Sequence, residues 1–100
     1  MQVRIEIKKI TVYEDLIREY ELPLEDTCNM YVGDVFFTDG KTKPDKLCDS
    51  AWETIQPFAE KLSRGEGHFY GDWMKNPLSA MISCNDGFRP VTFYLEAIDK

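Results

Sequence analysis

The sequence predicts an α+β fold, in which one long helix and one short helix cover a small, mainly antiparallel sheet. Near the two ends of the chain, residues 3–10 and 91–98 alternate apolar with polar side chains, as strands with one buried face do. Between them, residues 51–62 carry apolar side chains at helical spacing, which predicts an amphipathic helix. The chain has 100 residues, about the length of one domain, and no repeat or linker divides it. Residues 1–100 are therefore expected to form a single domain.

A short helix and a short strand are expected after the first strand. Thr11 and Glu14 match a capping box, which predicts a helix over residues 12–21, and Pro23 helps to end it. Residues 35–38 are aromatic and β-branched, which favours a strand. The polar residues after this strand predict a surface loop.

The long helix has signals at both ends and one interruption. Ser50 and Glu53 match a second capping box, and Gly65 fits a C-terminal cap. Pro57 lies inside the helix, where it removes a backbone donor and clashes with the preceding turn. Either the helix bends at Pro57, or two short helices meet there.

The last third of the chain predicts a packed loop and a hairpin. Residues 65–77 are aromatic, rich in glycine and without a period, so they are expected to form a loop packed onto the domain. Residues 79–84 favour a strand, and the Asn-Asp-Gly sequence at 85–87 favours a turn. We therefore expect a hairpin with residues 91–98, which should also pair with residues 3–10.

The charge balance and the cysteine content limit the partners and the location. The 18 acidic residues outnumber the 12 basic ones, which gives a formal net charge of −6. Nucleic acids and anionic membranes attract basic surfaces, so neither is an expected partner. No apolar stretch is long enough for a signal peptide or a membrane span. With three cysteines and no secretion signal, we expect a soluble cytoplasmic protein with reduced thiols.

The turn between the last two predicted strands gathers side chains that could bind a ligand. Within seven residues, Cys84 supplies a thiol, Asp86 a carboxylate and Arg89 a guanidinium. An arginine can clamp a carboxylate or phosphate through two parallel hydrogen bonds. The alternative is that Asp86 and Arg89 hold the turn. In either case we expect Arg89 to be anchored by a carboxylate or carbonyl partner rather than free in solvent.

The start of the long helix offers further candidates. The helix dipole would favour a thiolate at Cys48, although Cys48 also fits a packing role against the first helical turn. Trp52 lies beside the apolar stripe and could cover a groove. Since strand ends and helix starts commonly meet at one rim, we expect Cys48 and Cys84 to approach each other. The candidate ligand-binding residues are Cys48, Trp52, Cys84, Asp86 and Arg89.

A metal site is a special case of this idea. Thiolate and imidazole suit tetrahedral zinc, so the candidate ligands are Cys28, Cys48, Cys84 and His68. They are far apart in the sequence, and His68 has no evident carboxylate partner. The alternative is that the cysteines pack as small apolar side chains and His68 packs among its aromatic neighbours. No catalytic residue or cofactor follows, because no carboxylate pair or Cys-His pair is visible.

Two motifs resemble those of a known family. The sequence has a Cys-x-x-Ala-Trp motif at 48–52 and a Cys-x-Asp-Gly-x-Arg-Pro-Val motif at 84–91. In both motifs it resembles a TIGR-type family of small bacterial and archaeal proteins, and the resemblance extends over nearly the whole chain. The family has no established activity, so the resemblance implies no substrate and no catalytic residue. It does imply that all three cysteines occupy motif positions, which favours a shared cysteine site.

Two classes of function follow from these observations. The first is a small binding or redox module, with a cysteine-lined site for a ligand or metal. The second is a non-catalytic interaction subunit, such as a homodimer, in which the same residues are structural. The positions of the sulfur atoms distinguish them, because convergence on a cleft favours the first and burial in the core favours the second.

Overall fold

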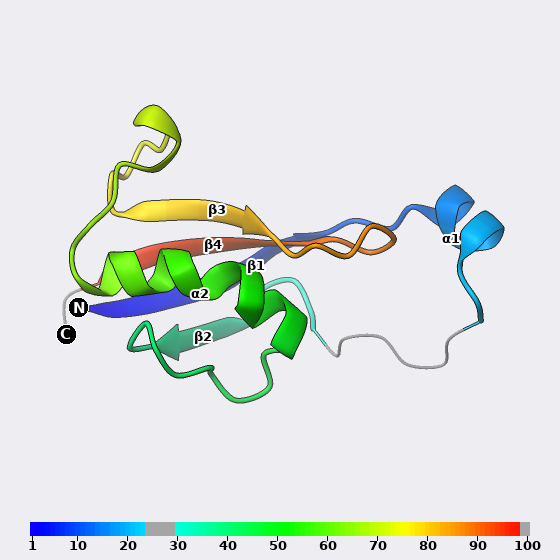
Figure 1. Ribbon diagram of the computed structural model, residues 1–100, viewed down its shortest axis with the longest axis horizontal. Helices are drawn as coiled ribbons and strands as arrows, with labels where there is room; N and C mark the ends of the chain where they lie inside the picture. The colour runs from blue at the N-terminus through cyan, green and yellow to red at the C-terminus, as the bar shows by residue number, and fades with distance from the viewer. Residues whose placement is uncertain (24–29, 99–100) are drawn as a thin grey trace.

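The computed structural model describes residues 1–23 and 30–98 and contains one four-stranded antiparallel sheet (Figure 1). The strands are β1 (Gln2–Ile10), β2 (Val35–Thr38), β3 (Ser79–Ser83) and β4 (Val91–Ile98). Their order across the sheet is β2-β1-β4-β3. The two alternating strands, β1 and β4, pair at the centre, and β3 forms a hairpin with β4. The predicted α+β class and these strand pairings are confirmed.

One face of the sheet is covered by α2 (Asp49–Ser63) (Figure 1). Alternate side chains of β1 and β4 point to this face, as the pleat of a strand requires, and most of them are buried. The apolar stripe of α2 packs onto them. The buried core consists of Val3, Ile5, Ile7, Met30, Leu47, Ala51, Ile55, Ala59, Leu62, Ala80, Ile82, Cys84, Val91, Phe93 and Leu95.

The two ends of α2 differ in how well the sequence predicted them. Cys48 has the extended backbone of an N-cap, and no side chain caps the first turn, so the capping box of Ser50 and Glu53 is wrong. The helix has already begun at Asp49, which puts the Ser50 side chain beyond the capping position. The C-terminal cap is confirmed, since Gly65 has a φ of +75° and its N–H donates to the carbonyl of Leu62.

α2 continues through Pro57 as one helix, so the alternative of two short helices is wrong. Ile55 and Ala59, on either side of the proline, are both fully buried. Their burial keeps the two halves of the helix on the same face of the sheet, which offsets the lost backbone hydrogen bond. A bend at Pro57 stays a prediction.

A narrow two-stranded ribbon extends beyond the sheet and carries α1 (Glu14–Tyr20) (Figure 1). The N–H of Thr11 donates to the carbonyl of Pro90, and the N–H of Tyr13 donates to the carbonyl of Phe88, both at 2.9 Å. We call residues 11–23 and 84–90 the arm, and the other described residues the body. The ribbon begins just beyond a β-bulge in β1, between Ile7 and Lys9.

Two expectations about the short helix are wrong. Its N-cap is Tyr13 and no side chain caps it, so the capping box of Thr11 and Glu14 does not form. Thr11 belongs to the ribbon instead, where its backbone is extended by pairing. α1 also contains no buried residue, because the ribbon carries it past the end of the sheet that both helices were expected to cover (Figure 1).

The aromatic loop after α2 packs onto the body in part, as predicted. Phe69, in the short 3-10 helix η1 (Phe69–Gly71), lies edge-on to Phe58 of α2, with 5.2 Å between the ring centres. The hydroxyl of Tyr70 donates to the carbonyl of Met81 at 2.9 Å and so covers part of the edge strand β3. Trp73, in contrast, is 83% exposed.

Candidate functional site

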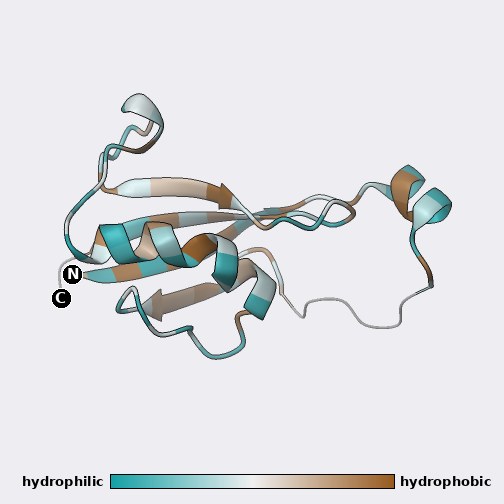
Figure 2. Ribbon diagram, viewed as in Figure 1, coloured by the Kyte–Doolittle hydropathy of each residue, from teal (hydrophilic) through white to brown (hydrophobic). Residues whose placement is uncertain are grey.

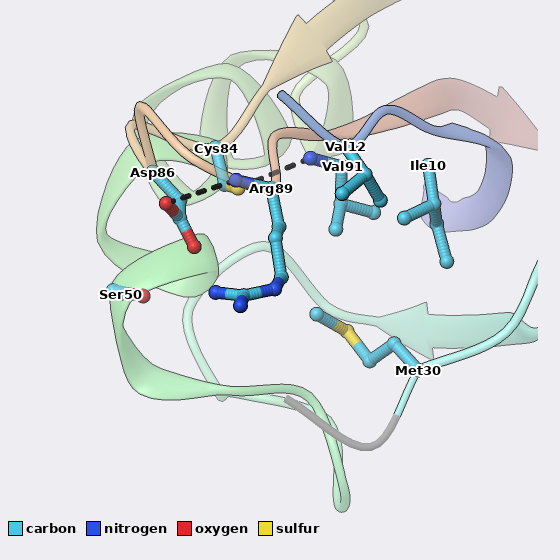
Figure 3. Close-up of a pocket in the computed structure, with 8 residues that line it drawn as sticks. All are labelled: Ile10, Val12, Met30, Ser50, Cys84, Asp86, Arg89 and Val91. Carbon is cyan, nitrogen blue, oxygen red and sulfur yellow. Dashed lines mark hydrogen bonds between the residues drawn. The ribbon is translucent and has the colours of Figure 1, made fainter. Parts of the chain in front are cut away.

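A pocket of about 260 Å³ lies where the arm meets the body (Figure 3). Its apolar walls come from the ends of β1 and β4, from the arm and from Met30. Its polar groups come from the first turn of α2 and from the hairpin between β3 and β4. The residues that line it are Ile10, Val12, Met30, Ser50, Cys84, Asp86, Arg89 and Val91. Three of the five sequence candidates, Cys84, Asp86 and Arg89, are therefore together in one cavity.

Cys84 forms a buried wall of the pocket. It follows β3 directly, and its N–H donates to the carbonyl of Val91 at 3.0 Å. The N–H of Val91 donates in return to Sγ of Cys84 at 3.3 Å (Figure 3). The thiol therefore takes the place of a backbone acceptor at the base of the hairpin, which is a structural role.

Asp86 shapes the turn and also faces the pocket. Its Oδ1 accepts the N–H groups of Phe88 at 2.8 Å and Arg89 at 3.1 Å, which fixes the turn as an Asx-type motif. In Figure 3 its carboxylate lies on the side of the pocket where Ser50 lies. A single oxygen atom makes both turn contacts, so the carboxylate keeps acceptor capacity for a group in the pocket.

Arg89 crosses the pocket and is anchored by a carboxylate from the other segment of the arm. Its Nη1 lies 2.8 Å from Oε1 and 3.1 Å from Oε2 of Glu21, just beyond the end of α1. The two side chains are 26% and 11% exposed, so water only partly screens the pair. The prediction that Arg89 is anchored by a carboxylate is confirmed. The carboxylate that it clamps in this structure is Glu21 of the same chain.

The charges around the pocket disfavour a simple anion. Arg89 supplies one positive charge, whereas Asp86 and Glu21 supply two negative charges. Asp49 adds a further carboxylate in the first turn of α2, where it offsets the partial positive charge of the helix N-terminus. This carboxylate lies 3.5 Å from Nζ of Lys43, so the three carboxylates face two basic groups. The net negative surroundings instead favour a group that is positively charged or donates hydrogen bonds.

Cys48 and Trp52 are not among the residues that line the pocket. Sγ of Cys48 lies 3.5 Å from Oγ of Ser50, and Ser50 is the residue that brings the first turn of α2 to the pocket. Trp52 is partly buried against the core, which is the packing role expected of a tryptophan beside a helix stripe. The close approach of Cys48 to Cys84 stays a prediction.

The four candidate metal ligands are not assembled into a site in the part of the chain that the structure describes. Cys28 lies outside the described residues. Within residues 1–23 and 30–98, no group of three His, Cys, Asp or Glu side chains is placed to hold a metal ion. His68 is exposed, and its Nδ1 lies 2.6 Å from Oδ1 of Asp72. Asp72 is thus a carboxylate partner that was not evident from the sequence. The alternative that His68 packs among its aromatic neighbours is wrong, because its side chain is 67% exposed.

Several residues around the pocket could not be predicted from the sequence. Glu21 is 68 positions from Arg89 in the sequence, and no local pattern distinguishes it from the other acidic residues near α1 as the partner of Arg89. Met30 and Val12 read as ordinary apolar residues. The capping-box pattern predicts a role for Ser50 at the helix start and not in a pocket. The sequence does predict that the start of α2 lies near the hairpin, but with Cys48 as the residue that makes the approach. The other polar residues of the site, Cys84, Asp86 and Arg89, could be predicted because they belong to one local turn motif.

Comparison with protein-family models, with curated proteins and with solved structures finds no match to this chain. The resemblance to the small-protein family therefore stays a prediction that rests on the two motifs. Among the described residues, no helix is long and apolar enough to cross a membrane.

Proposed function

We propose that the protein is a binding module for a small molecule in the pocket between the arm and the body. The ligand has an apolar part and an end that is positively charged or donates hydrogen bonds. One observation carries this proposal: four apolar side chains share a cavity with an acidic rim, where the Asp86 carboxylate has acceptor capacity left.

The size of the cavity restricts the class of ligand. Pockets for drug-sized ligands measure roughly 300–1,000 Å³, and this one is about 260 Å³. A branched aliphatic amine fits this description. Its alkyl group would contact Ile10, Val12, Met30 and Val91, and its ammonium group would lie beside Asp86.

Cys84 contributes packing to this proposal and no redox or metal chemistry. Its sulfur already accepts the Val91 N–H, and it is the single sulfur from a described cysteine in the lining. Arg89 contributes through its ion pair with Glu21, which joins the two segments of the arm beside the pocket. A loss of that ion pair would therefore weaken ligand binding without removing any ligand contact.

The test uses two probes of the same shape and opposite charge, isobutylamine and isobutyrate. At about ten times its Kd, a bound ligand stabilises the folded state by about 1.4 kcal/mol, which raises Tm by roughly 5–10 °C in a domain of this size. We expect isobutylamine to raise Tm and isobutyrate to leave it unchanged. No shift with isobutylamine, or a larger shift with isobutyrate, would contradict the proposal.

Asp86→Asn separates ligand binding from turn formation. The amide oxygen can still accept the N–H groups of Phe88 and Arg89, so the turn is kept while the negative charge is removed. We expect the variant to fold normally and to lose the isobutylamine effect. The matched control is Asp45→Asn, which removes an exposed carboxylate outside the pocket lining and should keep the effect.

A further inference from the structure

The two edge strands of the sheet, β2 and β3, differ in whether their outward backbone groups have partners. Positions that bond to the neighbouring strand alternate with positions that do not, so every second residue of an edge strand points its N–H and C=O groups away from the sheet. Met81 is such a residue in β3, and its carbonyl accepts the hydroxyl of Tyr70 at 2.9 Å. The loop around η1 therefore covers part of that edge.

The outer edge of β2 has no such cover among the described residues. The N–H of Ile7 in β1 donates to the carbonyl of Asp34 at 2.9 Å, and the next bonded position along β2 is Phe36. The N–H and C=O groups of Val35 and Phe37 therefore point outward. Within residues 1–23 and 30–98, these four groups have no hydrogen-bond partner. Unpaired groups in a row are a template for pairing with another strand.

The loop that follows β2 is held on the α2 side of the sheet and leaves this edge open. The hydroxyl of Thr38 donates to the carbonyl of Thr42 at 2.7 Å, and the side-chain amide of Gln56 in α2 donates to the carbonyl of Gly40 at 3.0 Å. A hollow of about 660 Å³ is lined by Lys46 of this loop and by the start of β2, so the loop does not lie against the strand there.

The side chains of β2 are suited to pairing with an apolar strand. Val35 and Phe37 lie on the face of the sheet that α2 does not cover, opposite Glu6 and Arg4 of β1, and they are 37% and 49% exposed. In Figure 2 the strand is brown, whereas the loop that follows it is largely teal. Proteins usually protect an edge strand with a charged residue or a proline, and the Val-Phe-Phe-Thr sequence of β2 has neither.

We propose that two copies of this chain form a homodimer by antiparallel pairing of their β2 strands, which joins the two sheets into one. Val35 of each copy bonds to Phe37 of the other, and the two Phe36 residues face each other at the two-fold axis. All four outward backbone groups of each copy then have partners. A register shifted by two residues would pair only one of the two outward-pointing residues of β2 with its counterpart, so the strand selects this register.

A second copy is favoured as the occupant because β2 is complementary to itself in this register. The exposed apolar side chains of Val35 and Phe37 lie opposite each other, which covers both. Asp34 lies opposite Thr38, so no two like charges face each other across the axis. The contact uses the same edge of both copies, and Tyr70 covers part of the other edge, so the assembly closes at two copies. This inference goes beyond ligand binding and uses different side chains.

The first experiment is sedimentation velocity over about 1 µM to 1 mM, because a single short strand from each copy makes a small and weak interface. We expect a concentration-dependent dimer. Phe37→Glu places a charge at the edge, opposite Arg4 of its own chain, and should raise the dimer Kd at least about tenfold. The matched control is Met81→Glu, the same change at a 44% exposed residue of the β3 edge, which should leave Kd unchanged.

The second experiment follows amide hydrogen exchange in the unaltered chain over the same concentrations. The Phe37 amide gains a hydrogen bond only in the dimer, so its exchange should slow at least about fivefold as the dimer forms. The Phe36 amide already bonds to β1 and should not change. A chain that is monomeric at about 1 mM overturns the proposal. So does a dimer that leaves Phe37 exchange independent of concentration, because another surface, such as the apolar face of α1, then forms the contact.

Discussion

The arm and the body are built from the same chain and held together in different ways. In the body, β1, β4 and α2 bury a continuous apolar core, and several of its large side chains have no exposed surface. In the arm, α1 contains no fully buried residue, and two ribbon hydrogen bonds and one ion pair hold it. The radius of gyration is 14.4 Å, compared with about 13 Å for a compact chain of this length, and both the arm and the loop around η1 project from the body (Figure 1).

The body and the arm are therefore stabilised by different interactions. Burial of one large apolar side chain contributes roughly 1.5–3 kcal/mol, so the body is stable through many additive contributions. A hydrogen bond contributes a net ~0.5–1.5 kcal/mol, and the arm has few of them. The arm should therefore open locally at a small cost while the body stays folded. A segment with this property is suited to rearrange around a ligand or a second chain.

The largest expected effect is the loss of unfolding free energy when a cavity is made in the core of the body. Phe93, at the centre of β4, is fully buried, so Phe93→Ala should cost about 3–5 kcal/mol of unfolding free energy. Leu16→Ala on α1 should change the same quantity by less than about 0.5 kcal/mol. Urea unfolding of each variant compares the two. Equal losses would mean that α1 packs on the body after all.

The next effect concerns close backbone packing. A Cβ on Gly40, which has a φ of +93°, would lie 2.6 Å from Oγ of Ser63 and 3.0 Å from the carbonyl of Ala59. Gly40→Ala should therefore cost at least about 2 kcal/mol, from a left-handed backbone and a steric clash together. Urea unfolding again measures the change.

Two glycine variants serve as controls for this prediction. Gly33 has a similar φ of +98° with no atom within 4 Å of the added Cβ, so Gly33→Ala should show only the backbone cost of about 1 kcal/mol. Gly87, in the arm, has neither a clash nor a left-handed φ in this structure, and Gly87→Ala should be close to neutral. If Gly33→Ala is as costly as Gly40→Ala, the close packing of α2 against the loop is not the cause.

The body could be predicted from the sequence, because its order comes from patterns that are local. Alternation in β1 and β4 fixes which side chains face the core, and a one-residue slip would expose all of them. The helical stripe of α2 works in the same way. The two capping boxes failed because a cap is only a small preference, of about 1 kcal/mol, which ribbon pairing at Thr11 and an earlier helix start at Asp49 override.

Only part of the pocket could be predicted from the sequence. The predictable residues are those that lie close together along the chain. Cys84, Asp86 and Arg89 lie within one turn, so their proximity follows from the turn sequence. Glu21 and Met30 reach the same place through the tertiary path of the arm and the body. No period or motif in one sequence specifies that path, because many folds share the same local patterns.

A smaller effect measures how firmly the two segments of the arm, residues 11–23 and 84–90, are held together. Glu21→Gln removes the charge that pairs with Arg89 and should cost about 1 kcal/mol, since the pair is partly buried. The cost should fall on the arm alone. We expect the amide of Tyr13 to exchange with solvent about fivefold faster, while that of Ile5 in the body is unchanged. Glu66→Gln, which breaks the more exposed pair with Arg64, is the control and should alter neither amide.

The smallest expected effect is a change in the pKa of Glu6, which lies on the face of the sheet that α2 does not cover. Hydrogen bonds from Lys8 and, secondly, from Arg4 hold the pKa of the Glu6 carboxyl below its ordinary value of 4.5. Because this pKa is lower in the folded state, the contribution of Glu6 to stability is complete above its unfolded pKa and is lost as pH falls through the folded value. Lys8→Met removes both the donor and the charge and should move the Glu6 titration midpoint, followed by NMR, up towards 4.5. Lys9 does not contact Glu6, so Lys9→Met should leave the midpoint in place. A shift caused by Lys9→Met instead would show that general charge, not the hydrogen bond, lowers the pKa.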